Sequence, residues 1–260
     1  MTTLEQPVVT GAISMMQRSS ERLCQLRKSM FRSLFAVVAI IAIAGCATST
    51  KVKQIDRLES VGENPRILIM EPDIKYYLLT VSGVPEPHAE WTIAARENFA
   101  NALKAYANER GTEVVMMTDS NQLGSAEIEY SKLHGAVGLT IQVNHFGQLR
   151  LPNKEGVFDW SLGPGVAEIG EKYNADYALF SYYRDYQASG GRVAFAVLAA
   201  ALGQVGGYSI GSEQGFASLV DLKSGDIVWF NVVQTSAGEL RDEQGAGTVV
   251  TNLFKGMPQR

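Results

Sequence analysis

A serine between glycines is the clearest candidate nucleophile in the sequence. Residues 207–211 (GYSIG) have the G-x-S-x-G spacing of the hydrolase elbow, in which a turn from a strand to a helix presents the serine hydroxyl, here that of Ser209. Such a serine needs a histidine base later in the chain, but the last histidine is His145. Because the residues after Ser209 also predict a strand, we expect a glycine-flanked loop, and a serine hydrolase is only a minor alternative.

The remaining motifs do not indicate a metal or cofactor site. The three histidines have no closely spaced carboxylate or cysteine partners, and we expect each at the surface or in a loop: His88, His134 and His145. Neither H-E-x-x-H nor G-x-x-x-x-G-K-[ST] occurs. The glycines of residues 163–170 do not match G-x-G-x-x-G, so a dinucleotide site is not expected either.

Four acidic residues fall at the ends of predicted strands: Glu71, Asp73, Asp176 and Asp185. If two of them met in the fold, they could act as a general acid and a general base. Turn and cap roles explain the same residues more simply, because carboxylates readily accept hydrogen bonds from nearby backbone N–H groups. The sequence therefore predicts no enzyme, no cofactor and no metal.

The strongest functional signal lies near the amino terminus. Residues 34–44 (LFAVVAIIAIA) form an apolar run of 11 residues, too short for the roughly 20 that cross a bilayer as a helix. Basic residues precede this run and small residues follow it, as in a secretory signal peptide. Ile43, Ala44 and Gly45 stand directly before Cys46 and resemble a bacterial lipobox, in which the cysteine takes a diacylglycerol and, after cleavage, a fatty acid such as palmitate. The alternative is a buried apolar helix that happens to end in Gly-Cys.

These signals divide the chain into four parts. Residues 1–29 are expected to be an upstream extension, because translation from Met30 would give a compact signal. Residues 30–45 are then the lipoprotein signal peptide, and the polar residues 46–65 a lipid-anchored linker. Residues 66–260 are predicted to form a periplasmic α/β domain.

Charge and cysteine content limit what the mature chain could bind. Of the 23 basic and 27 acidic residues, five and two precede Cys46, so the mature chain would carry a net charge of −7. Such a chain is not expected to bind nucleic acid, or anionic lipid headgroups by electrostatics. Cys24 would be removed with the signal and Cys46 acylated, which leaves no thiol for a disulfide, a zinc site or catalysis.

Apolar periodicity predicts an α/β fold: a mixed sheet of about five strands with flanking helices and a C-terminal β-hairpin. The predicted strands are residues 66–70, 112–118, 176–186, 216–222 and 227–234, and the predicted helices are 89–109, 125–145, 166–173 and 248–255. The proline-rich residues 71–87 are expected to form a loop. Asn174 is expected to end the third helix, and Gly225 to supply the positive φ of the hairpin turn.

A second apolar segment, residues 192–202 (RVAFAVLAAAL), lies between glycine-rich stretches and allows two interpretations. Its ten consecutive apolar residues, 193–202, cannot span a bilayer as a helix. The segment is either a core helix against one face of the sheet, or a helix that docks on a membrane or on a partner. In the second case the docking side chains would be Val193, Phe195, Val197, Leu198 and Leu202.

Two motifs resemble those of a known family. Residues 219–229 (LVDLKSGDIVW) resemble a strand pair, and residues 175–180 (ADYALF) the preceding strand, of the envelope lipoproteins that share the amino-terminal domain fold of TolB. That group includes the CsgG-like secretion lipoproteins and the LpoB-like activators of peptidoglycan synthases. The resemblance indicates mainly the fold.

The resemblance implies a non-catalytic lipoprotein of the outer membrane that is exposed to the periplasm, where its domain binds or regulates another cell-envelope component. Ala47, in place of Asp after the acylated cysteine, resembles the outer-membrane sorting pattern. The expected partners are the membrane, through the lipid anchor, and an envelope protein or a second copy of the chain. The alternative is an oligomeric secretion or assembly lipoprotein that self-associates through residues 193–202.

Overall fold

The computed structural model describes residues 48–53, 58, 65–110, 114–117, 124–154, 156–203, 209–234 and 238–258. The predicted extension (1–29), the signal peptide (30–45) and the lipobox residues up to Cys46 lie outside these residues. The chain divides into two compact units, Met1–Cys46 and Ala47–Arg260, and every described residue belongs to the second. The description below therefore concerns that unit.

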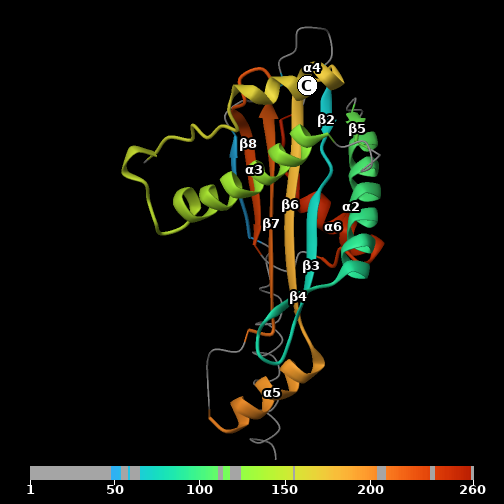
Figure 1. The fold of residues 1–260 in the computed structure, drawn as a ribbon, viewed down its shortest axis with the longest axis vertical. Helices are drawn as coiled ribbons and strands as arrows, with labels where there is room; N and C mark the ends of the chain where they lie inside the picture. Colours follow the sequence, from blue (N-terminus) through green and yellow to red (C-terminus); the bar gives the residue numbers. More distant parts are fainter. Residues whose placement is uncertain are drawn as a thin grey trace, which may run out of the picture. The chain divides into compact units, whose positions relative to one another are not determined.

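An eight-stranded mixed sheet forms the centre of the domain (Figure 1). Its strands are β1 (Thr48–Lys53), β2 (Ile67–Ile69), β3 (Asp73–Leu79), β4 (Pro85–Pro87), β5 (Val114–Met116), β6 (Tyr177–Ala188), β7 (Gly211–Asp221) and β8 (Ile227–Gln234). The long strand β6 pairs in parallel with β2 and β3, one after the other, while β5 pairs in parallel with β2. On its other side β6 pairs antiparallel with β7, followed by β8 and β1. Strand β4 pairs antiparallel with β3.

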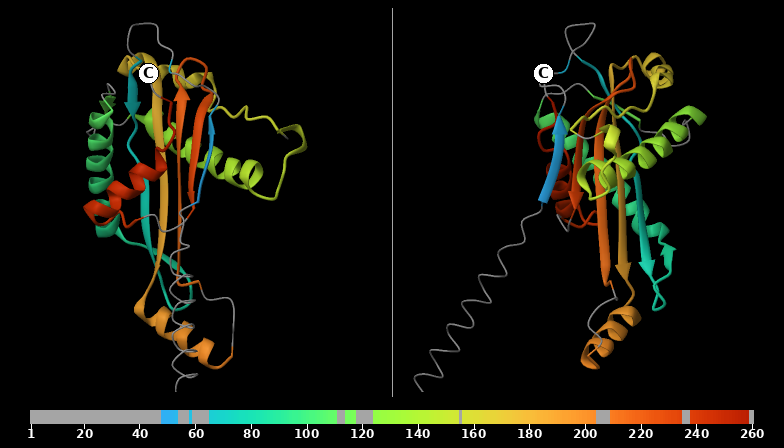
Figure 2. Two further views of the ribbon diagram at one scale, coloured as in Figure 1. Left: turned by 180° about the vertical axis from the view of Figure 1, so that it is seen from behind. Right: turned by 90° about the vertical axis from the view of Figure 1, so that its left-hand side faces the viewer.

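Helices cover both faces of the sheet, so the domain has three layers (Figure 2). The helices are α2 (Ala89–Glu109), α3 (Ser125–Ile141), α4 (Ala167–Tyr173), α5 (Gly190–Ala201) and α6 (Glu243–Leu253), and a π-helical turn, Gln142–Phe146, continues α3. Helices α2 and α6 pack on one face, and α3 and α4 on the other. Helix α5 follows β6 and lies beyond the end of the sheet at which β6 ends.

Alternating side chains of the strands fill two cores. On β6, Tyr177, Leu179 and Tyr183 belong to the core under α2 and α6, whereas Ala178 and Phe180 belong to the core under α3 and α4. This period-2 alternation explains why the strand is apolar along most of its length, because both of its faces are covered. The domain is thus stabilised by apolar packing on both sides of one sheet.

The predicted fold class is confirmed, and each of the five predicted strands and four predicted helices is present, α2 and β8 with the predicted ends and the others with shifted ends. Asn174 ends α4 in the left-handed conformation (φ 48°), and Gly225 has a φ of 84° in the β7–β8 turn. A Cβ at Gly225 would also collide with the backbone of Gly163. Helix α6 begins earlier than predicted, because the Asp242 carboxylate accepts a hydrogen bond from the N–H of Gly245 (2.7 Å) and caps it there.

Two predictions about irregular segments are wrong. The predicted loop of residues 71–87 contains β3 and β4, since prolines are tolerated at strand ends and on edge strands such as β4. The predicted linker of residues 46–65 contains β1, which pairs with β8. Among the described residues, no helix is both long and apolar enough to cross a membrane.

Candidate functional site

Helix α5 is attached to the sheet through its first turn. The Ser189 hydroxyl accepts a hydrogen bond from the N–H of Arg192 (3.3 Å) and caps the helix, and the N–H of Ser189 donates to the carbonyl oxygen of Leu79 in β3 (2.9 Å). The Arg192 side chain is buried, and its Nε donates to the carbonyl oxygen of Ser209 (2.7 Å). These contacts join α5 to the ends of β3, β6 and β7.

Most of the rest of α5 is exposed. Of its residues only Arg192 and Ala199 are buried. The five predicted docking side chains are exposed, with fractions between 41% and 73%: Val193, Phe195, Val197, Leu198 and Leu202. The interpretation of this segment as a core helix is therefore wrong, because the helix continues past the end of the sheet and has no sheet face beneath it (Figure 1).

Three further exposed apolar side chains lie at the same end of the sheet as α5. Val81 and Val84 occupy the turn between β3 and β4, where a Cβ at Gly191 would lie 2.9 Å from Val81 Cγ2. Ile210 precedes β7, and its carbonyl oxygen accepts a hydrogen bond from the N–H of Ala188. We call these three residues and the five predicted docking residues, four in α5 and Leu202 directly after it, the apolar tip. It holds eight of the fourteen exposed large apolar side chains among the described residues.

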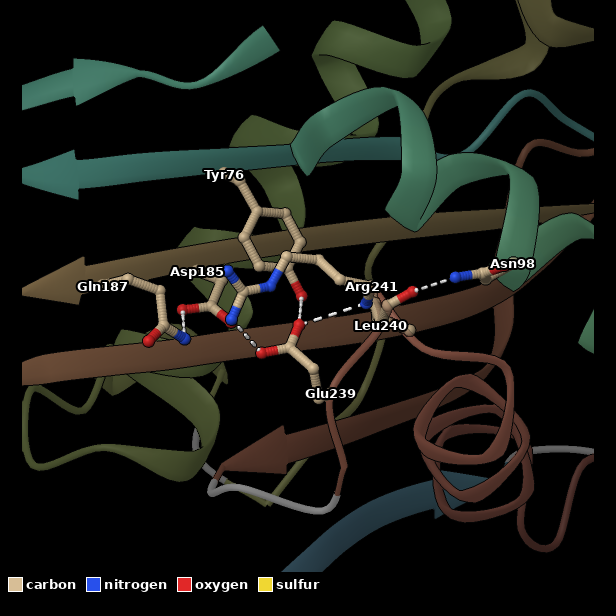
Figure 3. Close-up of polar contacts among 7 residues, drawn as sticks. All are labelled: Tyr76, Asn98, Asp185, Gln187, Glu239, Leu240 and Arg241. Carbon is tan, nitrogen blue, oxygen red and sulfur yellow. Dashed lines mark hydrogen bonds and ion pairs between the residues drawn. The ribbon is translucent and has the colours of Figure 1, made fainter. Parts of the chain in front are cut away.

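A polar cluster lies on the face of the sheet that carries α2 and α6 (Figure 3). The Tyr76 hydroxyl, from β3, donates to Glu239 Oε1 (2.9 Å), and Arg241 forms an ion pair with Glu239 at 2.5 Å. Asp185, from β6, accepts a hydrogen bond from Gln187 Nε2 (2.9 Å). We call Tyr76, Asp185, Glu239, Arg241 and the neighbouring Glu213 the carboxylate cluster.

Burial sets the protonation of this cluster. Together with the nearby charge of Glu239, it raises the pKa of Asp185 to about 6 and that of Glu213 to about 7. Burial also raises the pKa of Tyr76, so that its hydroxyl keeps its proton and donates. Burial alone would raise the pKa of Glu239 as well, but hydrogen bonds from Arg241 and Tyr76 together lower it.

The contacts of the carboxylate cluster are those of a structural clamp. The Tyr76–Glu239 hydrogen bond joins β3 to the segment between β8 and α6, and the guanidinium of Arg241 also lies 4.5 Å from the ring centre of Trp91 in α2. Asn98, also in α2, donates to the carbonyl oxygen of Leu240 (3.0 Å). In the described part of the chain, no group of three or more His, Cys, Asp or Glu side chains could hold a metal ion.

The four acidic residues expected at strand ends do not form a carboxylate pair. Glu71 pairs with Arg96 at 3.4 Å, and Asp73 with Arg184 at 2.7 Å. Asp176 accepts a hydrogen bond from the N–H of Arg66 (2.9 Å), as expected of a structural carboxylate. Only Asp185 lies near other carboxylates, and its neighbours Glu213 and Glu239 are not among the four.

Ser209 does not occupy a hydrolase elbow. Its hydroxyl donates to the carbonyl oxygen of Gly211 (2.9 Å), and the chain continues as strand β7 rather than as a helix. Ser209 therefore lies directly before β7 and is exposed there.

A serine and a histidine do meet elsewhere, in the core. His134 Nε2 and the Ser218 hydroxyl are 2.8 Å apart, and at most 1% of either residue is exposed. Burial lowers the pKa of His134 to about 3, so the ring is neutral at physiological pH. The prediction that His134 lies at the surface or in a loop is wrong, because the ring packs between Phe180 and Phe216 beneath α3. A substrate has no access to a pair buried in this way.

The fold and the site define a three-layer α/β domain with an apolar helix beyond one end of its sheet. No family model matches the chain, and no curated protein matches it. Among solved structures, it is similar to the PelC dodecamer from Paraburkholderia phytofirmans, with 10% identity, a TM-score of 0.37 and coverage of 83% of this chain and 99% of that one. It is also similar to lipoprotein GNA1162 from Neisseria meningitidis, with 13% identity, a TM-score of 0.29 and coverage of 72% and 93%. At such low TM-scores these likenesses carry no argument about function.

Proposed function

We propose that this chain is a non-catalytic lipoprotein of the bacterial outer membrane, whose periplasmic domain binds another component of the cell envelope through the apolar tip. The observation that carries the proposal is the tip itself. Monomeric soluble domains rarely expose a contiguous group of large apolar side chains, and such a group marks a contact surface. The lipobox that ends at Cys46 would supply the anchor.

The non-catalytic part of the proposal is supported by the candidate catalytic groups. Ser209 is bonded to its own turn, the neutral pair of His134 and Ser218 is buried, and the carboxylate cluster clamps a loop. A folded preparation should therefore not react with a serine-directed fluorophosphonate. Labelling that disappears in a Ser209→Ala variant would overturn this part of the proposal.

The anchor is tested by labelling cells with an alkyne analogue of palmitate and purifying the tagged protein. The expected result is a labelled protein in the outer-membrane fraction, with the label lost in Cys46→Ala. Cys24→Ala is the matched control and should keep the label, because that cysteine precedes the expected cleavage site. A Cys46→Ala variant that is labelled as strongly as the wild type would contradict the anchor.

Self-association is the second candidate, because an apolar surface of this kind also suits an interface between copies of one chain. In-cell crosslinking distinguishes the two. A ladder of self-adducts that map to residues 193–202 would favour an oligomeric assembly lipoprotein. The absence of such a ladder, with the protein in the outer-membrane fraction, agrees with the first proposal.

A further inference from the structure

The direction of β1 relates the start of the mature chain to the apolar tip. Strand β1 runs antiparallel to β8, with Thr48 beside Gln234 and Lys53 beside Trp229. Val233 of β8 lies beside Gly215 of β7, and from Gly215 the strand β7 continues back to Gly211, next to α5. Strand β1 therefore begins toward the end of the sheet that carries the tip, and its arrow in Figure 2 points away from that end.

Chain connectivity then limits where an anchor at Cys46 can be. Cys46 precedes Thr48 by two residues in the sequence, and two residues span at most about 7 Å. The four residues from Gly215 to Gly211 extend about 13 Å further toward α5. If Cys46 carries acyl chains, as the proposed function holds, these chains leave the domain on the side of the apolar tip.

The chemistry of α5 fits an acyl-chain layer better than a groove on a protein. A groove covers one side of a helix, but α5 is apolar all round and only two of its residues are buried. Residues 193–210 contain no Asp, Glu, Lys or Arg, so no charge would enter the hydrocarbon. A helix of 12 residues is about 18 Å long, comparable with one leaflet at about half of the 30 Å hydrocarbon thickness.

We propose that the apolar tip inserts into the acyl-chain layer of the same membrane leaflet that holds the lipid on Cys46. This inference rests on the proposed function and names the envelope component that the tip binds. The domain then has two attachments at one end, the acyl chains near β1 and the helix α5. Because the mature chain is acidic, insertion depends on apolar contact and takes place in zwitterionic lipid as well.

Spin labels test the insertion in the full mature lipoprotein. The protein is purified from membranes and reconstituted in vesicles of phosphatidylcholine and phosphatidylethanolamine. A nitroxide is attached to Leu198→Cys in α5, where the new cysteine is the only free thiol if Cys46 is acylated and Cys24 removed. Val157→Cys is the matched control. Val157 is also exposed, and the nearby Ser161 bridges to Asp226 in the β7–β8 turn, at the opposite end of the sheet.

The expected result is a label on Leu198→Cys that collides several-fold more often with dissolved oxygen than with a water-soluble nickel complex, and the reverse on Val157→Cys. Val84→Cys, in the β3–β4 turn of the tip, should behave like Leu198→Cys. A label on Leu198→Cys that favours the nickel complex would overturn the proposal. So would a label shielded from both reagents and broadened by a second label, which would indicate a second copy of the chain.

Failure of the insertion and failure of the proposed function give different results. Mass spectrometry of the same preparation reports whether Cys46 carries acyl chains, and flotation reports whether the protein stays with the vesicles. A protein without acyl chains would contradict the proposed function. A protein that is acylated and floats, but has a water-exposed label on Leu198→Cys, would contradict the insertion alone.

Discussion

Two carboxyl groups of the carboxylate cluster, those of Asp185 and Glu213, lie in environments that disfavour their charged form. Asp185 is 2% exposed and lies close to Glu239, and its pKa is raised to about 6. The unfolded chain lacks these neighbours, so Asp185 titrates there near its ordinary value of about 4. The folded state therefore binds this proton more tightly than the unfolded state does. The contribution to stability is present below about pH 4 and is lost as the pH rises through about 6.

Asp185→Asn should remove this pH dependence, because an amide does not titrate. We expect the stability of the variant relative to the wild type, measured as the difference between their free energies of unfolding, to be up to about 3 kcal/mol greater at pH 8 than at pH 4. Urea unfolding at the two pH values measures the difference. His134 has a lowered pKa and acts with the opposite sign, but it is present in both proteins and cancels. A relative stability that does not change with pH would show that the carboxyl of Asp185 is not perturbed by burial.

The sequence is informative for residues whose role depends on near neighbours in the chain. Asn174 and Gly225 were predicted correctly, since a helix end and a two-strand turn are local structures. The clamp formed by Tyr76, Glu239 and Arg241 could not be predicted, because Tyr76 is more than 160 residues from the other two and meets them only in the folded domain. His134 was predicted wrongly for the same reason, because its partner Ser218 lies on a distant strand.

At the scale of elements, two helical glycines should respond to alanine in opposite directions. A Cβ at Gly138 in α3 would collide with the ring of the buried Phe216, whereas a Cβ at Gly247 in α6 meets nothing within 4 Å. We expect Gly138→Ala to destabilise the domain by about 1–3 kcal/mol through overpacking. Gly247→Ala should stabilise it by about 0.5–1 kcal/mol, because alanine favours the helix. Thermal unfolding of the pair measures both, and a Gly138→Ala variant as stable as the wild type would contradict the packing of α3 on β7.

Helix α5 should contribute little to the stability of the domain. Val197 is 65% exposed, and we expect Val197→Asp to change the free energy of unfolding by no more than about 0.5 kcal/mol. Leu219→Ala in β7 is the core control and should cost about 2–5 kcal/mol, because Leu219 is fully buried. Chemical denaturation without membranes is the appropriate measurement. A large loss in Val197→Asp would mean that α5 packs on the domain.

The elements that the sequence predicted are those with a clear apolar period. Helix α2 was predicted with its observed ends from its apolar period, β6 from its aromatic residues, and the β7–β8 hairpin from two apolar runs on either side of the turn residues 223–226. Strand β1 could not be predicted because its sequence, TSTKVK, is largely polar and its pairing with β8 is long-range. The exposure of α5 could not be predicted either, since an all-apolar segment looks the same in a core and beyond the end of a sheet.

For the whole molecule, the pairing of β1 changes the expected relation to the membrane. A free linker over residues 46–65 would hold the domain about 25 Å from its anchor. With β1 beginning at Thr48, only Ala47 separates it from Cys46. A lipid on Cys46 therefore keeps the sheet close to the membrane, which is the condition under which the apolar tip can reach the acyl chains.

The proposed function requires that Cys46 is the acylated first residue of the mature protein. The most direct measurement is the mass of the amino-terminal peptide of protein purified from the outer-membrane fraction. We predict a peptide that begins at Cys46 and carries a diacylglycerol and an amide-linked acyl chain, with no peptide from residues 1–45. A mature protein that retains residues before Cys46, or whose Cys46 is unmodified, would contradict the account.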